Sequence, residues 1–212
     1  MQATFMDNWV KVTGEVLHGE PYFPAITPAG KSAAQMFSSS PSGGAESMQL
    51  MYHMAITAAQ SSIDLSMAYF VPDELLRIMR DALKRGVRIR IITAGPITDT
   101  ETVRAAGRAT WGEILQAGAE IYEYQPTMYH CKVLVVDKLV VSVGSTNFDS
   151  RSFRLNDEAN LNIYDAAFAA RQTEIFEQDL ARAKRITLEQ WQARPLKEKL
   201  HEKLTAVLHS QL

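Results

Sequence analysis

The chain has 212 residues, of which 46% are hydrophobic, enough for one sizeable buried core without any need for two domains. A formal charge of -2 and an isoelectric point near 6.2 argue against strong non-specific binding to nucleic acids, which usually requires a basic surface. The single cysteine, Cys131, excludes a disulfide bond within these residues, and no apolar run approaches the ~18 residues of a transmembrane helix.

Strands and helices are predicted to alternate after an amino-terminal segment of 30 residues and a Ser/Gly-rich loop or linker at residues 38–44. The strands are expected at residues 63–70, 87–93, 119–124, 132–136, 139–143 and 159–164. The helices are expected at residues 46–60, 72–86, 101–116 and 166–184, with Asp73 and Glu74 in the first turn of the second helix. This alternation predicts an α/β fold, a layered domain with a mixed β-sheet flanked by helices.

The carboxyl-terminal residues predict one more helix, because leucines recur at every fourth position with lysines between them. The leucines are Leu196, Leu200, Leu204, Leu208 and Leu212, and the lysines are Lys197, Lys199 and Lys203. We expect this helix to dock on its own domain, with contact to anionic lipid as the alternative. The domain is then expected at residues 31–185, and residues 186–212 form a helical extension.

Residues 132–136 and 139–143 are predicted to pair as a hairpin with Asp137 and Lys138 between them. Asp-Lys is not the Asp-Gly pair favoured in two-residue turns, so the turn type stays open. Because side chains alternate along a strand, His130 and Lys132 are expected on one face and Cys131 on the other. One face of the hairpin therefore carries an imidazole and an ammonium group, while Cys131 is expected to be a buried packing residue.

These residue types suit chemistry at a phosphate ester. An imidazole can attack phosphorus or donate a proton to a leaving alkoxide, and Lys132 can stabilise charge on the phosphate oxygens. Ser145 and Asn147 add neutral hydrogen-bond donors for the phosphate, so no metal or other cofactor is required. A lone strand histidine is more often structural than catalytic, and this interpretation therefore depends on the complete set.

The spacing His-x-Lys-x4-Asp-x6-Gly-Ser-x-Asn, which runs from His130 to Asn147, resembles the signature motif of the phospholipase D superfamily. The resemblance implies that His130 and Lys132 are catalytic. It also implies that Asp137, the third motif residue, holds the hairpin and does not touch the substrate. Glu158 matches the downstream glutamate of the family, which pairs with the motif histidine and could orient its imidazole.

Further segments resemble the second catalytic module of bacterial cardiolipin synthases, namely residues 68–74, 147–153 and 155–158. This narrower resemblance implies phosphatidyl transfer between phospholipids, with phosphatidylglycerol as the substrate. It also implies a cytoplasmic chain in peripheral contact with the bacterial inner membrane. Residues 1–30 then look like a linker or the tail of an upstream module that is missing here.

The family reaction uses two facing copies of the motif, whereas this sequence contains one. The only other His-x-Lys spacing, His201 to Lys203, lacks the following Asp and Gly-Ser. A homodimer, a partner chain or an upstream module of a longer protein could supply the second half-site. The alternatives to phosphatidyl transfer are a homodimeric phosphodiesterase or nuclease and a half-module that is inactive alone. The loop at residues 95–100 could line the substrate opening, although a plain connector is the simpler interpretation.

Overall fold

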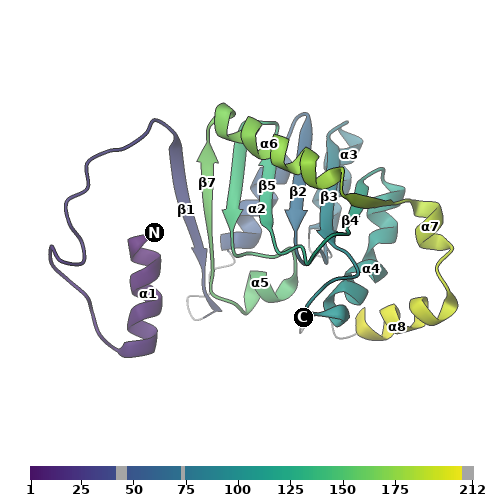
Figure 1. Cartoon of the computed structure of the whole chain (residues 1–212), viewed down its shortest axis with the longest axis horizontal. Helices are drawn as coiled ribbons and strands as arrows, with labels where there is room; N and C mark the ends of the chain where they lie inside the picture. The colour runs from purple at the N-terminus through teal and green to yellow at the C-terminus, as the bar shows by residue number, and fades with distance from the viewer. Residues whose placement is uncertain (42–46, 73–74, 207–212) are drawn as a thin grey trace.

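The computed structural model describes residues 1–41, 47–72 and 75–206. Within them, one mixed sheet has the strand order β1-β7-β6-β5-β2-β3-β4-β8 (Figure 1). Its strands are β1 (Ala33–Ser39), β2 (Ser62–Met67), β3 (Arg88–Ala94), β4 (Glu120–Tyr124), β5 (Lys132–Val136), β6 (Val140–Gly144), β7 (Glu158–Tyr164) and β8 (Ala183–Ile186). β2, β3 and β4 pair in parallel, and the other neighbours pair antiparallel. The predicted α/β fold with a mixed sheet is confirmed.

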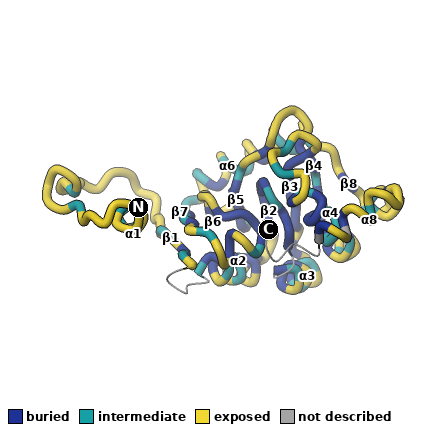
Figure 2. The backbone as a smooth tube through the Cα atoms, turned by 90° about the horizontal axis from the view of Figure 1, so that it is seen from below, coloured by how far each residue is buried: buried dark blue, intermediate teal, exposed yellow. Residues whose placement is uncertain are grey.

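Helices cover both faces of the sheet, with α6 on one face and α2, α3 and α4 on the other (Figure 1). The helices are α1 (Gln2–Thr13), α2 (Ser47–Ala58), α3 (Leu76–Lys84), α4 (Glu101–Gln116), α5 (Ser150–Arg154), α6 (Ala166–Leu180), α7 (Leu188–Gln192) and α8 (Leu196–Ala206). Because both faces are covered, the central strands are buried, as their continuous apolar runs indicate (Figure 2).

Two edge strands, β1 and β8, were not predicted. The long helix was expected to continue to residue 184 but ends at Leu180, and residues 183–186 pair with β4 instead. The predicted loop at residues 38–44 is wrong for Ser38 and Ser39, which belong to β1 and pair with β7. Both strands depend on a partner that is distant in sequence, and β1 has mostly exposed side chains without the alternation of a half-buried strand.

Two element boundaries also differ from the prediction. The strand expected at residues 63–70 ends at Met67, and the helix expected from Pro72 begins at Leu76. Asp73, Glu74 and residues 42–44 of the predicted loop lie outside the described residues. In the segment between β2 and α3, Phe70 forms an isolated β-bridge with Phe148.

The two ends of the chain attach to the domain through ion pairs. α1 lies beyond β1, has no buried residue, and is linked by Lys11 to Asp157 at 3.2 Å (Figures 1 and 2). α8 packs on α4, where Glu202 accepts hydrogen bonds from Arg108 and Arg194. The expected docking of this helix therefore occurs, but through the face of Glu202 and not through Leu196, Leu200 or Leu204. Leu208 and Leu212 lie outside the described residues. The boundaries predicted at residues 30 and 185 stay predictions.

Candidate active site

Antiparallel pairing of β5 with its two neighbours gathers the motif residues other than Asp137 at one end of the sheet, the lower end in Figure 1. Lys132 is the first residue of β5 and pairs with Met67, the last residue of β2. Because the two strands are antiparallel, Tyr69, two residues after Met67, lies beside His130, two residues before Lys132. On the other side β6 ends at Gly144 and Ser145 follows, bonded through its N–H to the carbonyl of Ala159 at 3.1 Å. We call this end, with the loops that continue from it, the site end.

His130 and Lys132 form the centre of the site. The Lys132 Nζ lies 3.1 Å from the His130 Nε2 and 3.3 Å from the carbonyl oxygen of the same residue. The imidazole is exposed, whereas Lys132 is only 8% exposed. Burial lowers the pKa of the Lys132 ammonium, and the negative charge of Glu158 partly opposes that shift. The pair therefore presents a partly desolvated cation directly beside an accessible imidazole.

Cys131 lies on the opposite face, as alternation predicts. It packs against a cluster under α6 that includes Tyr124 and Tyr129. Burial raises the pKa of its thiol, which disfavours the reactive thiolate. Cys131 is a packing residue, and the candidate catalytic groups lie on the opposite face with His130.

Tyr69 and Asp99 join the site although the sequence did not single them out as site residues. The Tyr69 hydroxyl donates to both carboxylate oxygens of Asp99 at 2.7 Å, and its ring stands edge-on to the His130 imidazole at 6.2 Å between centroids. The Lys132 Nζ lies 5.9 Å from the centre of the same ring. The hydrogen bond from Tyr69, with the nearby His130, lowers the pKa of Asp99.

Two signals in the sequence pointed toward this pair. Tyr69 lies in a segment that resembles cardiolipin synthases, and Asp99 lies in the loop at residues 95–100 that was considered as a lining of the substrate opening. The structure favours that interpretation over a plain connector, since the loop places a carboxylate beside the imidazole through Tyr69.

Ser145, Asn147 and Glu158 line the other side of the site end. The Ser145 hydroxyl donates to the Glu158 carboxylate and accepts the N–H of Ala159 at 3.0 Å. Asn147 is 9% exposed, and its side-chain oxygen has no partner among the described residues. A buried amide oxygen without a partner is uncommon, so this group is available to a ligand or to another chain.

Gly144 makes this arrangement possible because β6 and β7 approach closely there. A Cβ at this position would lie 2.2 Å from both the Ala159 carbonyl oxygen and the Asn160 Oδ1. Asn160 is fully buried and accepts hydrogen bonds from the backbone N–H and hydroxyl of Thr146. The Gly-Ser of the motif thus sets the path of the chain that carries Ser145 and Asn147.

The described hydrogen bonds of Glu158 go to Ser145 and, at 3.2 Å, to the side chain of Asn156. His130 is not among these partners. Glu158 instead acts on Lys132 electrostatically, since its charge raises the pKa of that ammonium. Its role in orienting the imidazole stays a prediction.

Asp137 is the one motif residue that the structure does not bring to the site. It lies at the opposite end of β5, where its carboxylate accepts the backbone N–H groups of Gln60, Ser61 and Ser62 at 2.7–2.9 Å. Burial opposes its ionisation, but these hydrogen bonds prevail and lower its pKa. The sequence left the turn type open. Asp137 and Lys138 both have positive φ, as the two central residues of a type I′ turn do, and the hydrogen bonds to residues 60–62 hold Asp137 in this conformation. This position fits the structural role expected of Asp137.

Asp149 is a further buried acid near the site that the sequence did not single out. It caps α5 by accepting the N–H of Ser152 at 2.7 Å. Burial raises its pKa from 3.8 to about 6, with Glu158 adding to the effect and the Ser152 hydrogen bonds opposing it. Its negative charge raises the pKa of both Lys132 and Tyr69.

Among the described residues, no group of three His, Cys, Asp or Glu side chains could hold a metal ion.

A family model described as "Cardiolipin synthase, PLD-like domain" matches residues 52–180, which include the whole motif and Glu158. The chain belongs to this cardiolipin synthase, phospholipase D-like domain family. The chain is 34% identical to a cardiolipin synthase of Geobacillus kaustophilus (strain HTA426) over 211 residues. The aligned segment covers 98% of this chain and 42% of that protein. The chain is 31% identical over 210 residues to a cardiolipin synthase of Oceanobacillus iheyensis, covering 98% and 43% respectively. The chain thus spans less than half the length of these relatives.

Solved structures place the same fold in proteins of two sizes. Nuc of Salmonella typhimurium, a phospholipase D family member, has a TM-score of 0.64 and 22% identity, covering 74% of this chain and 99% of that one. The phosphatidylserine synthase of Haemophilus influenzae Rd KW20 has a TM-score of 0.69 and 16% identity, covering 88% of this chain and 49% of that one. These similarities show the fold alone.

Proposed function

We propose that the chain supplies one half-site of a cardiolipin synthase type phosphatidyltransferase that acts on phospholipid phosphodiesters, with phosphatidylglycerol as the substrate. The observation that carries the proposal is the contact of the Lys132 Nζ with the His130 Nε2 at 3.1 Å, at an exposed end of the sheet. The similarity to cardiolipin synthases over 98% of the chain supports the choice of substrate.

In the proposed reaction, one imidazole attacks phosphorus, and the bond from phosphorus to the oxygen of the headgroup glycerol breaks. A phosphatidyl group is then bound to the histidine. The facing imidazole donates its proton to that oxygen, and glycerol leaves. The hydroxyl of a second phosphatidylglycerol then gives a proton back to this imidazole and attacks phosphorus, which releases the first histidine and forms cardiolipin. We assign the proton-donor role to His130 if an upstream module faces it, and both roles in a homodimer.

The other site residues serve the phosphate. The Lys132 ammonium stabilises negative charge on the oxygens that do not react. The side-chain N–H of Asn147 is proposed to donate to the phosphate, as is the Ser145 hydroxyl once its proton turns from Glu158 to the phosphate. Glu158 balances the charge of Lys132 and is proposed to orient the imidazole. A phospholipid substrate also implies peripheral contact with a membrane, which we propose is the cytoplasmic side of the bacterial inner membrane.

Three features support a half-site. The sequence contains a single complete motif, and His130 is exposed and free to meet a second surface. The curated relatives are also more than twice as long as the segment that this chain matches. A second copy, a partner chain or an upstream module would each complete the site.

The test measures the products formed from phosphatidylglycerol vesicles, by the chain alone and by the chain with a second motif-bearing module. Cardiolipin plus glycerol is the expected result, and phosphatidic acid would indicate hydrolysis. His130→Ala should abolish turnover, while His18→Ala, at an exposed position outside the domain, should not. Absence of any lipid product in every arrangement would contradict the proposal.

A homodimeric phosphodiesterase or nuclease is the second candidate, because the sequence contains one complete motif and a second copy of the same chain could supply the other. DNA cleavage that persists in a chelator and disappears in His130→Ala would favour it. Measurement of the mass in solution tests the third alternative, an inactive half-module: a dimer with activity would exclude it, and a strictly monomeric chain without turnover in every arrangement would favour it.

A further inference from the structure

The helix α8 exposes a row of three leucines. Leu196, Leu200 and Leu204 are 82%, 62% and 63% exposed. In contrast, Glu202 and Thr205 on the same helix are buried against the domain. At about 100° per residue, the leucines occupy the side of α8 that faces away from the domain. Three large apolar side chains on one outward face are more than the scattered exposure normal for a soluble surface.

A buried ion-pair network prevents the helix from turning this row inward. The Glu202 carboxylate accepts from the Arg108 Nε at 3.1 Å and from the Arg194 guanidinium at 2.7 Å. Arg108 also contacts Glu123 of β4 at 2.7 Å, and Arg194 stacks on Trp191, which in turn donates to the Arg108 carbonyl at 2.6 Å. Rotation of α8 would leave these buried charges unpaired, which is costly. The outward direction of the leucines is therefore a fixed property of the fold.

The charges on α8 are sorted in the same way. Both carboxylates face the domain, since Glu202 is paired and Glu198 lies 3.8 Å from Arg108. Lys197 is exposed and Lys199 is half-buried, and both flank the leucine row. The outward half of the helix thus presents leucines with lysines beside them, the pattern of a helix that lies on an anionic lipid surface.

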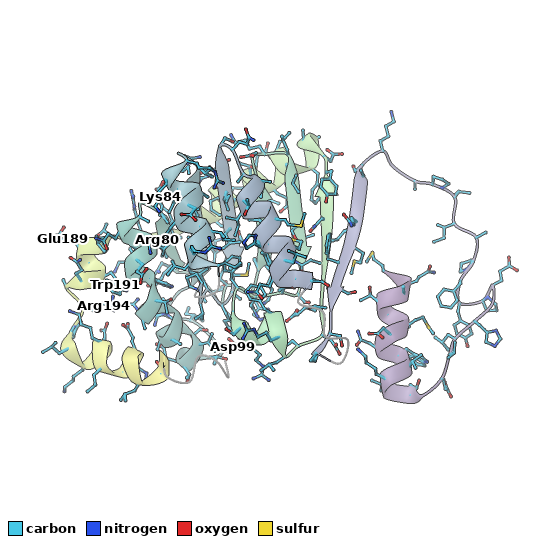
Figure 3. The ribbon with its side chains drawn as sticks, turned by 180° about the vertical axis from the view of Figure 1, so that it is seen from behind. Arg80, Lys84, Asp99, Glu189, Trp191 and Arg194 are labelled. Atoms are coloured by element: carbon cyan, nitrogen blue, oxygen red, sulfur yellow. The ribbon has the colours of Figure 1, made fainter. Side chains whose placement is uncertain are left out.

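The same end of the molecule carries the site. α8 lies at the lower end in Figure 1, and Figure 3 shows Asp99 and α8 at this end in the opposite view. Loops at the site end expose further large apolar side chains, with Ile97 51%, Met128 37% and Leu155 52% exposed. Ile97 is in the loop of Asp99, Met128 lies two residues before His130, and Leu155 directly follows α5.

We propose that the leucine row of α8 binds the surface of an anionic phospholipid bilayer and turns the site end toward the lipid headgroups. The inference rests on the proposed function in one respect. A chain that acts on a phospholipid must reach a bilayer, so we assign the leucine row to a bilayer and not to a second protein. It adds the surface and orientation through which the chain reaches that substrate.

The experiment measures co-sedimentation of the chain with phosphatidylglycerol vesicles and with phosphatidylcholine vesicles. We expect binding to phosphatidylglycerol that falls by at least about 10-fold in Leu200→Ser/Leu204→Ser. The matched control is Leu139→Ser/Ile175→Ser, two exposed residues on the β5–β6 turn and on α6, which should bind as the wild type. Lys197→Glu/Lys199→Glu should weaken binding to phosphatidylglycerol selectively, and added salt should do the same.

Several outcomes would overturn the inference. Equal binding to both lipids, an equal loss in the control pair, or no vesicle binding by the wild type would each exclude this anionic-lipid surface. A dimer without lipid that Leu200→Ser/Leu204→Ser converts to a monomer would assign the row to a second copy. Unchanged thermal unfolding verifies that the substitutions leave the fold intact. Because binding is measured without turnover, His130→Ala should bind vesicles normally, and a failure here leaves the proposed chemistry standing.

Discussion

The Lys132 ammonium is largely shielded from solvent and has no directly paired counter-ion among the described residues. No carboxylate of the described residues forms an ion pair with its Nζ, whose hydrogen-bond partners are the imidazole and the carbonyl of His130. A buried cation without a paired anion is costly, and a bound phosphate would supply the missing charge. The burial that lowers the pKa of Lys132 thus also strengthens its interaction with a phosphate ester.

Replacement of Lys132 by Ala should therefore remove most turnover while the fold persists. We expect a fall of at least about 100-fold in kcat, since the substitution deletes charge stabilisation in a partly buried site. Lys138→Ala, in the turn at the far end of β5, is the matched control and should keep wild-type turnover. Circular dichroism checks the fold, and unchanged turnover in Lys132→Ala would contradict the assigned site.

Asp149 should make the stability of the domain depend on pH. Its pKa is raised from 3.8 to about 6, so the folded state favours the protonated carboxyl. The stabilisation is present at low pH and is lost as the pH rises through about 6, amounting to roughly 3 kcal/mol across the window from pH 4 to pH 6. Asp149→Asn keeps a capping side chain and removes the titration.

Denaturant unfolding at several pH values measures this effect. The wild type should lose free energy of unfolding between pH 4 and pH 6 relative to Asp149→Asn, and the two curves should run parallel outside that window. A constant difference between the two proteins at all pH values would show that Asp149 does not titrate there.

At the scale of elements, the close approach of β6 and β7 decides where the site residues lie. A methyl group at Gly144 would meet the Ala159 carbonyl and Asn160, which together hold Ser145 and Thr146. Gly144→Ala should therefore separate the two strands, lower the free energy of unfolding by about 1–3 kcal/mol, and reduce turnover. Val143→Ala, at the preceding position of β6, which is 37% exposed, should leave turnover unchanged. Thermal unfolding and the lipid assay measure both variants, and wild-type behaviour of Gly144→Ala would show that the strands can relax.

At the scale of the whole molecule, the number of motif copies in the active assembly becomes the question. Mixing the wild type with His130→Ala in increasing proportion tests it in whichever assembly converts phosphatidylglycerol. If another segment or chain supplies the second motif, activity should fall in proportion to the wild-type fraction. A fall with the square of that fraction would identify a homodimer that needs both copies of His130. We expect the proportional result, because the relatives are more than twice the length of the matched segment.

The sequence alone predicted which residues carry the proposed chemistry, and it determined that His130 and Lys132 share one face. Alternation along one strand is a local property, so the common face of His130 and Lys132, and the opposite face of Cys131, followed from spacing. The helices and inner strands were likewise predicted from patterns within short segments. The edge strands β1 and β8 were not, since their free energy comes from pairing with β7 and β4.

Only the tertiary structure decided what surrounds the imidazole and which surface of the molecule is left apolar. Tyr69 and Asp99 are 30 residues apart and meet through the order of β2 and β3 in the sheet. The four-residue spacing of the leucines in α8 predicts a face that packs against the domain. The ion pairs of Glu202 with Arg108 and Arg194 instead direct the leucines outward. Local periodicity specifies that a face is apolar, but the partners gained from the rest of the chain determine what that face meets.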